Sequence, residues 1–236
     1  MKDVLVEVRK ELKAQADEKT LASFQRFFKE GVKAYGVKTA GVAKIAAAHS
    51  KEVLPLGKNS VFALCEDLLK TGYSEEATIA FDWAYRFRKD FKPQDFKVFE
   101  RWLERYVGNW AKCDTLCNHT IGSFIEKYPE YIAKLKEWTR SKNRWVRRAA
   151  AVTLIVPAKH GKFLEDIFEI SDSLMGDKDD LVQKGFGWLL KEASHSHREE
   201  VFDYIMRNRN IMPHTTLRYA IEKMPPELKK QAMEKA

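Results

Sequence analysis

The stretch Ala77-Thr78-Ile79-Ala80-Phe81 places a small residue four positions before a large apolar one, and this spacing returns along the chain. A small residue recurs every 36 positions, at Gly41, Ala77, Cys113, Ala149 and Gly185. Four positions after each of them stand Ile45, Phe81, Cys117, Thr153 and Leu189. An internal period in the thirties is typical of stacked helix pairs, each of which cannot bury its apolar face alone. The sequence therefore predicts an all-α fold, an α-solenoid.

Turn-forming residues divide the chain into about a dozen helices, with breaks such as 31–39 and 157–161, and no segment is typical of a strand. Side-chain oxygens suited to helix N-caps stand at Ser74, Asp177 and Ser141 or Asn143. Because stacked repeats share one continuous core, we expect residues 1–236 to form a single domain of HEAT-like repeats.

The composition indicates a cytoplasmic protein. The chain is 44% hydrophobic and has no run of about 18 apolar residues that could span a bilayer. Its first residues mix acids into what would have to be an apolar stretch, so they do not form a secretory signal. The three cysteines, Cys65, Cys113 and Cys117, are an odd number, which argues against a disulfide framework. We therefore expect no membrane partner.

Basic residues outnumber acidic ones, 42 against 34, and gather in two clusters. The larger holds Lys134, Lys136, Arg140, Lys142, Arg144, Arg147 and Arg148, with Glu137 as the acid among them, and the smaller holds Arg86, Arg88, Lys89 and Lys92. One interpretation is a solvated polar face, since Lys and Arg favour helix C-termini. The other is a stripe that gives the solenoid a concave basic face, which would attract a phosphate backbone or an acidic protein.

The third repeat departs from the common pattern at Trp110 and Asp114. These residues are four apart, so on a helix they lie one above the other on the same face. Asp114 brings a charge into a register that is otherwise Val42, Thr78, Ala150 and Phe186. Trp188 stands out similarly two repeats later. Core packing of each tryptophan and a helix-dipole role for Asp114 are the alternatives, but together the three predict an aromatic-walled pocket with one acid.

The motifs that contain these residues resemble a known family. They are Trp110-Ala-Lys-Cys-Asp114, Arg148 within Trp145-Val-Arg-Arg-Ala-Ala, Gln183-Lys-Gly-Phe-Gly-Trp188 and Tyr35-Gly36-Val37-Lys38-Thr39. The chain is similar over nearly its whole length to the AlkD-type DNA alkylation-repair glycosylases, which are built from HEAT-like repeats. This resemblance implies the same fold and a duplex DNA partner that carries alkylated bases.

The resemblance also implies roles for single residues. Asp114 would be the catalytic carboxylate, with Trp110 and Trp188 as the cleft aromatics beside it. Phe27 or Phe28 falls where family members often carry a tyrosine, and Phe27 would line the substrate cleft. The implied DNA contacts are Lys38, Thr39, Lys44, Arg147, Arg148 and Lys184. The expected enzyme is a monomer that needs no cofactor, and it hydrolyses the N-glycosidic bond of positively charged 3-alkyladenine and 7-alkylguanine.

Other motifs point to less. The spacing of Cys113 and Cys117 with nearby His119 lacks the second ligand pair of a zinc site, so we expect no metal. The sequence also lacks a phosphate-binding glycine-rich loop and a Ser-His-Asp signature. The alternative function is a non-catalytic helical-repeat scaffold that binds nucleic acid or an acidic protein.

Overall fold

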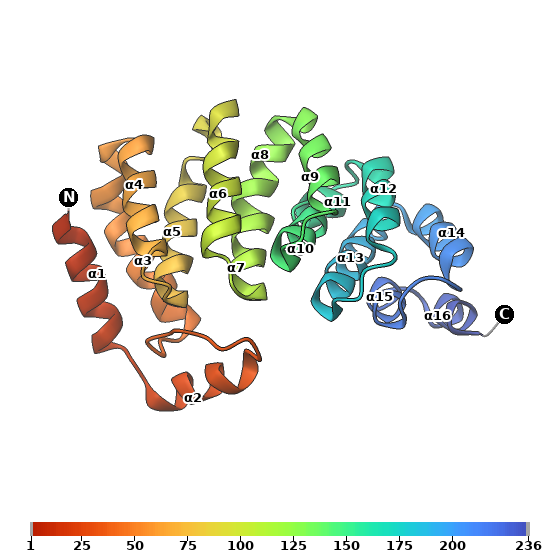
Figure 1. Cartoon of the computed structure of the whole chain (residues 1–236), viewed down its shortest axis with the longest axis horizontal. Helices are drawn as coiled ribbons and strands as arrows, with labels where there is room; N and C mark the ends of the chain where they lie inside the picture. The colour runs from red at the N-terminus through yellow and green to blue at the C-terminus, as the bar shows by residue number, and fades with distance from the viewer. Residues whose placement is uncertain (1, 235–236) are drawn as a thin grey trace. The chain divides into compact units, whose positions relative to one another are not determined.

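The computed structural model describes residues 2–234, and within this range the chain is helical and contains no strand. Its internal contacts divide it into two compact units, Met1–Leu116 (unit 1) and Cys117–Ala236 (unit 2), shown from red to blue in Figure 1. The prediction of an all-α fold of stacked helices is thus confirmed, whereas the single domain stays a prediction.

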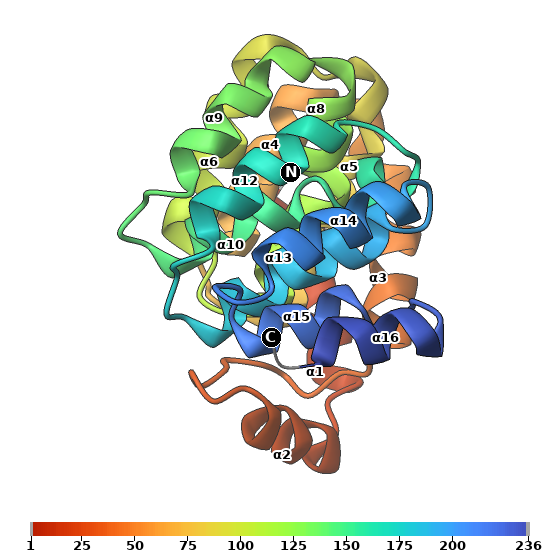
Figure 2. The same cartoon turned by 90° about the vertical axis from the view of Figure 1, so that its right-hand side faces the viewer.

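Unit 1 is a stack of helices from which one helix stands apart. Its helices are α1 (Lys2–Ala14), α2 (Glu18–Phe27), α3 (Thr39–Val53), α4 (Lys58–Leu69), α5 (Ser74–Arg86), α6 (Phe96–Tyr106) and α7 (Trp110–Thr115). Short 3-10 turns lie at Leu54–Leu56, Arg88–Asp90 and Pro93–Asp95. Helix α5 packs against α3, α4 and α7, and α1 packs against α3. Helix α2 lies away from this stack in both views (Figures 1 and 2).

Unit 2 continues the pattern with shorter helices. A π-helical segment over Leu116–Ile121 follows α7 in the chain, and a 3-10 turn lies at Pro129–Tyr131. The helices are α8 (Gly122–Lys127), α9 (Ile132–Trp138), α10 (Arg144–Val152), α11 (Ile155–Lys159), α12 (Leu164–Leu174), α13 (Asp180–Ala193), α14 (Arg198–Asn208), α15 (His214–Ala220) and α16 (Pro226–Met233). Helix α13 packs against α10, α12 and α15. The described residues form more helices than the dozen expected, partly because the helical segment over 144–159 is broken between α10 and α11.

The repeat of 36 positions is a repeat of buried sites. Its small residues lie on α3, α5, α7, α10 and α13, and Ala77, Cys113 and Ala149 are at most 1% exposed. All five positions four residues later are buried, including Thr153, which is polar. Each of these helices therefore turns the same face inward, because residues four apart share one side of a helix. The burial expected from the sequence is confirmed at nine of the ten positions, and Gly41 is half-buried.

The helix starts agree only in part with the expected caps. The side chain of Asn143 accepts the backbone N–H of Trp145 and caps α10, as predicted. Helix α5, in contrast, begins at Ser74 itself, with Tyr73 at the N-cap and no side-chain cap. Helix α13 is capped by Asp179, whereas Asp177 accepts the N–H of Asp179 from outside the helix. Ser74 and Asp177 were thus wrong as caps.

Candidate active site and nucleic-acid contacts

Helix α7 presents Trp110 and Asp114 on one face. The side chain of Asn109 accepts the backbone N–H of Lys112 at 2.9 Å, which fixes the first turn so that the helix begins at Trp110. Asp114 follows one turn later, and both side chains are half-buried. A carboxylate at this depth is accessible to solvent and yet partly shielded from it, so its charge acts over a longer range than at an exposed site.

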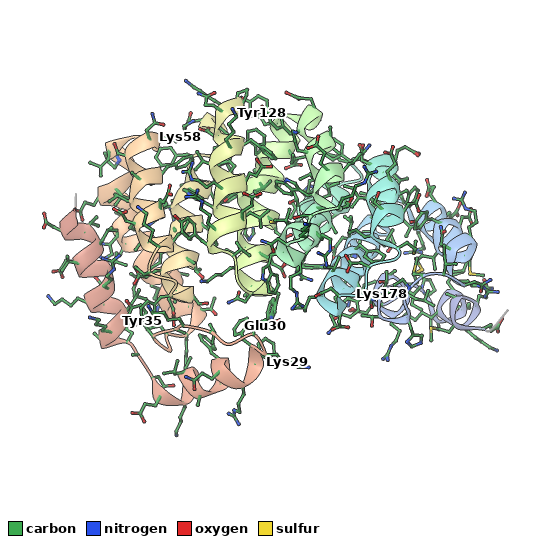
Figure 3. The ribbon with its side chains drawn as sticks, viewed as in Figure 1. Lys29, Glu30, Tyr35, Lys58, Tyr128 and Lys178 are labelled. Atoms are coloured by element: carbon green, nitrogen blue, oxygen red, sulfur yellow. The ribbon has the colours of Figure 1, made fainter. Side chains whose placement is uncertain are left out.

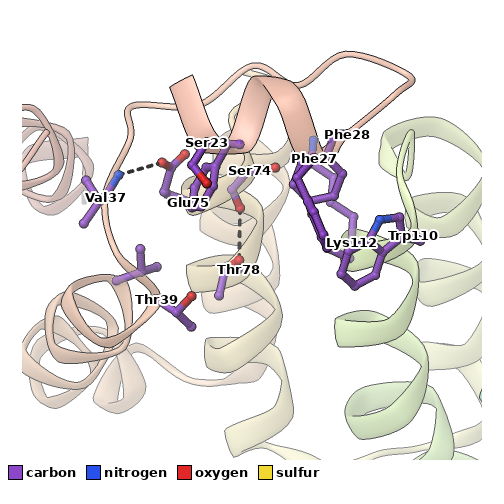
Figure 4. Close-up of a pocket in the computed structure, with 13 residues that line it drawn as sticks. Ser23, Phe27, Phe28, Val37, Thr39, Ser74, Glu75, Thr78, Trp110 and Lys112 are labelled. Carbon is purple, nitrogen blue, oxygen red and sulfur yellow. Dashed lines mark hydrogen bonds between the residues drawn. The ribbon is translucent and has the colours of Figure 1, made fainter. Parts of the chain in front are cut away.

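Two phenylalanines at the end of α2 pack against Trp110 (Figure 4). The ring of Phe28 is stacked on the indole, with centroids 5.4 Å apart and planes 28° from parallel. Phe27 meets the same indole edge-on, with centroids 5.6 Å apart and an angle of 72°. Phe28 is 8% exposed, whereas Phe27 is 66% exposed. Phe28 therefore packs as a structural residue, and Phe27 presents its ring to solvent beside the indole.

A pocket of about 340 Å³ lies between α2 and the stacked helices of unit 1 (Figure 4). Phe27, Phe28 and Trp110 form its aromatic side. Val37 contributes from the segment before α3, and Thr39 and Val42 contribute from the start of α3. The carboxylate that lines this pocket is Glu75, whereas Asp114 is not one of its lining residues. A pocket of this size and apolar character can hold a ring system.

Lys112 lies in the wall of the same pocket. Its Nζ donates a hydrogen bond to the backbone carbonyl of Gly72 at 2.8 Å. Burial disfavours the charged ammonium and lowers the pKa of Lys112. The amine thus ties α7 to the turn before α5.

The turn that leads into α3 is open to solvent. Lys38 occupies the N-cap position of α3 without a side-chain cap, and Lys38, Thr39 and Lys44 are all exposed. The first turn of α3 contains no acidic residue, so its backbone amides and the helix dipole carry positive potential. The three proposed DNA contacts of this region are accessible.

The predicted contacts in unit 2 are more enclosed. Arg148 is 5% exposed and donates a hydrogen bond from Nη1 to the carbonyl of Leu181. Arg147 donates from Nε to Oδ2 of Asp177 at 2.6 Å. Lys184 is paired with Asp180, four residues earlier on α13, at 2.6 Å. If Arg147 and Lys184 bind DNA phosphates, each would interact with a phosphate and with its acidic partner, Asp177 or Asp180, at the same time.

The basic cluster over 134–148 is more neutral than the linear sequence indicates. Acids from α12 and from the loop before α13 reach back to it, as in the ion pairs Lys136–Asp166, Lys136–Glu169, Arg144–Asp179 and Arg147–Asp177. Exposed positive charge remains at Arg140, Lys142 and Lys178, the last of which projects from that loop (Figure 3). Glu137 is the acid within the cluster in the linear sequence, because the other acids lie about one repeat further along the chain.

Trp188 is half-buried on α13, and its indole N–H donates to Oε1 of Glu192 at 3.1 Å. The glycine before it has a packing role. A Cβ on Gly187 would lie 2.7 Å from Cβ of Tyr219 and 2.8 Å from the carbonyl oxygen of Thr216. This glycine therefore allows α15 to approach α13 closely, which explains why the motif before Trp188 contains it.

The structure also bears on the cysteines, on metal binding and on membrane-spanning helices. Cys65, Cys113 and Cys117 are each buried in the core. Within residues 2–234, no three His, Cys, Asp or Glu side chains are grouped as a metal site would require. The same range contains no helix with the length and apolar character needed to cross a membrane.

Comparisons with known proteins agree with this architecture. Residues 8–224 match the family described as DNA alkylation repair enzyme. The chain is also similar to the solved structure of a predicted DNA alkylation repair enzyme from Enterococcus faecalis, with a TM-score of 0.80 and 15% sequence identity. That match covers 90% of this chain and 98% of the other, and at this identity it shows the fold. The comparison with curated proteins gives no match.

Proposed function

The chain belongs to the DNA alkylation repair enzyme family, and from this premise we propose that it is a monofunctional DNA glycosylase. It hydrolyses the N-glycosidic bond of positively charged alkylated purines, 3-alkyladenine and 7-alkylguanine, in duplex DNA. The products are the free base and an abasic site. Formation of the abasic site is the first step of base excision repair. The observation that carries the proposal is the half-buried carboxylate of Asp114 one turn after the half-buried indole of Trp110.

The chemistry requires little acid catalysis. Alkylation at N3 of adenine or N7 of guanine makes the base cationic, so the C1′–N bond breaks as its electron pair neutralises the base. Positive charge then develops on the sugar. Asp114 would stabilise that charge and orient the water that attacks C1′, and the proton of that water would pass to the solvent. Such preorganised electrostatic stabilisation is commonly worth about 3 kcal/mol or more.

Aromatic rings supply the preference for damaged bases. An indole face attracts a cation by roughly 0.5–2 kcal/mol, depending on how well water is excluded. We assign this role to Trp110 and Trp188, and we assign Phe27, exposed beside Trp110, to the wall of the substrate cleft. A neutral purine would lose the cationic part of this attraction.

Duplex DNA would be held through its phosphates. We propose Lys38, Thr39, Lys44, Arg147, Arg148 and Lys184 as its contacts. Of these, Lys38, Thr39 and Lys44 are exposed, and the arginines and Lys184 are engaged within unit 2. The enzyme would act as a monomer in the cytoplasm and without a cofactor.

The test is the release of free 7-methylguanine or 3-methyladenine from methylated duplex DNA, with unmethylated duplex as control. We expect release by the wild-type protein and no release from the unmethylated duplex. Salt-dependent DNA binding without any base release would instead support the non-catalytic scaffold.

A further inference from the structure

The segment of residues 17–37, called the α2 arm here, projects from the stacked helices of unit 1 (Figure 1). Helix α2 itself has no buried residue. The two ends of the arm meet where the backbone N–H of Asp17 donates to the carbonyl of Gly36 at 3.0 Å. Gly36 has a φ of +89°, and a Cβ there would lie 2.6 Å from the carbonyl oxygen of Asp17. The arm therefore leaves unit 1 and returns to it at nearly the same place. Its position depends on how these two ends, called its base, are attached to the rest of unit 1.

The carboxylate of Glu75 binds three backbone amides of that base. Oε1 of Glu75 accepts the backbone N–H groups of Tyr35 at 3.0 Å, Gly36 at 2.9 Å and Val37 at 3.1 Å. Glu75 lies in the first turn of α5 and is 3% exposed. A carboxylate only accepts hydrogen bonds, and a buried one requires several donors to offset its lost hydration. Three consecutive amides meet this need and form a strong attachment.

The next residue reinforces the attachment. Oε1 of Glu76 accepts the phenol O–H of Tyr35 at 2.7 Å, and its Oε2 accepts Nε–H of Arg9 at 3.1 Å. The ring of Tyr35 also stacks on Tyr73, with centroids 4.0 Å apart and planes 14° from parallel. Figure 3 labels Tyr35 at this base and Lys29 at the far end of the arm. The base is thus fixed to α5, whereas the far end reaches Trp110 through Phe27 and Phe28.

We propose that Glu75 is a positioning residue that fixes the α2 arm on unit 1. By holding the amides of residues 35–37, it sets the direction in which the chain enters α3 at Lys38 and Thr39. The same attachment sets how the far end of the arm places Phe28 on Trp110. Glu75 acts through the backbone and makes no contact with DNA in this proposal. The part that concerns DNA rests on the proposed glycosylase function.

The first readout needs no DNA. In Glu75→Gln the side chain loses its charge and one of its two acceptor oxygens, so it binds the three amides more weakly. Hydrogen exchange at Tyr35, Gly36 and Val37 should be slow in the wild type and faster in this variant. Gly36→Ala should have a similar effect, because its Cβ pushes the two ends of the arm apart. Glu66→Gln is the matched control, since Glu66 accepts bonds from Arg101, Trp102 and Tyr106 away from the arm.

The second readout uses methylated duplex DNA. If the arm presents Lys38 and Thr39, Glu75→Gln should raise the KM for base release by about tenfold, equivalent to about 1.4 kcal/mol. Its kcat should stay within about twofold of the wild type, because the variant changes where DNA contacts lie and leaves Asp114 in place. Glu66→Gln should change neither parameter.

The outcomes separate the two proposals. Unchanged amide exchange in both Glu75→Gln and Gly36→Ala overturns the role of Glu75. Faster exchange with an unchanged KM overturns the link from the arm to DNA. If the wild type releases no base, the glycosylase proposal fails, and exchange together with the affinity for duplex DNA still decides the role of Glu75. If either Glu75→Gln or Gly36→Ala does not fold, the measurements are made on the other variant.

Discussion

Phe28 and Trp110 are stacked, with ring centroids 5.4 Å apart, and this contact joins the end of α2 to the start of α7. Since Phe28 is 8% exposed and Phe27 beside it is 66% exposed, adjacent rings have different environments against one indole. One face of the indole is already covered by protein. A ligand at Trp110 would therefore meet the remaining indole surface and the exposed ring of Phe27.

This arrangement predicts different costs for truncating the two rings. Phe28→Ala should lower the free energy of unfolding by about 3 kcal/mol, because it removes a buried ring that supports Trp110. Phe27→Ala should change it by no more than about 0.5 kcal/mol, since that ring is largely exposed. Phe27→Ala should nevertheless reduce the rate of base release. Urea unfolding and a base-release assay on both variants provide the measurements.

Equal destabilisation by the two variants would contradict the packing described for Phe28. Base release that is unaffected by Phe27→Ala would remove Phe27 from the substrate cleft, whatever the stability result.

The proposed chemistry depends most on Asp114. Asp114→Asn keeps the shape of the side chain and removes its charge, so base release should fall by about two orders of magnitude or more. Folding and most of the DNA affinity should be retained. Asp82→Asn is a suitable control, because Asp82 is an acid of α5 paired with Arg86 at 2.7 Å. Undiminished excision by folded Asp114→Asn would remove the catalytic assignment.

Much of the fold could be predicted because the repeat encodes burial directly. Positions such as Ile45 and Phe81 stand at a fixed distance from a small residue, and both are 1% exposed. Helix starts were less predictable. Asp177 and Asp179 are two residues apart and both can cap a helix, so the choice depends on backbone geometry that the sequence does not display.

The placement of Trp110 and Asp114 on one helix was predictable because it depends on local sequence. Asn109, Trp110 and Asp114 lie within one turn and a half, so their placement followed from helical spacing. The partners of Glu75 lie about 40 residues earlier in the chain. An acid in the first turn of a helix is usually explained by the helix dipole. The sequence therefore offered no reason to expect that Glu75 contacts the arm. The pairing of Arg147 with Asp177 could not be predicted either, because the two residues are 30 positions apart in the chain.

Tyr204 predicts a pH dependence of stability. Its side chain is buried, and its O–H donates to Oδ1 of Asp172 at 2.6 Å. Burial, together with this bond to a carboxylate, raises the pKa of the Tyr204 phenol above its ordinary value of about 10. The folded state therefore keeps a proton that the unfolded state loses near pH 10. The stabilisation by Tyr204 is complete below that pH and decreases as the pH rises further.

Tyr204→Phe cannot lose this proton, so it isolates the effect. We expect the wild type to be more stable than Tyr204→Phe by about 1 kcal/mol at pH 8. The difference should narrow between pH 10 and 11, as measured by urea unfolding at each pH. A difference that stays constant across this range would contradict the raised pKa.

Salt dependence tests the proposed phosphate contacts of α3. Each lysine that neutralises a phosphate releases counterions, so the logarithm of the binding constant falls linearly with the logarithm of salt concentration. Lys38→Ala and Lys44→Ala should each reduce the magnitude of that slope by about one. The control is Lys97→Ala, because Lys97 is an exposed lysine of α6 to which no contact is assigned. Slopes from fluorescence anisotropy with duplex DNA provide the measurement. If Lys97→Ala reduces the slope as much as Lys38→Ala does, the affinity comes from overall charge, and the turn before α3 is not a specific contact.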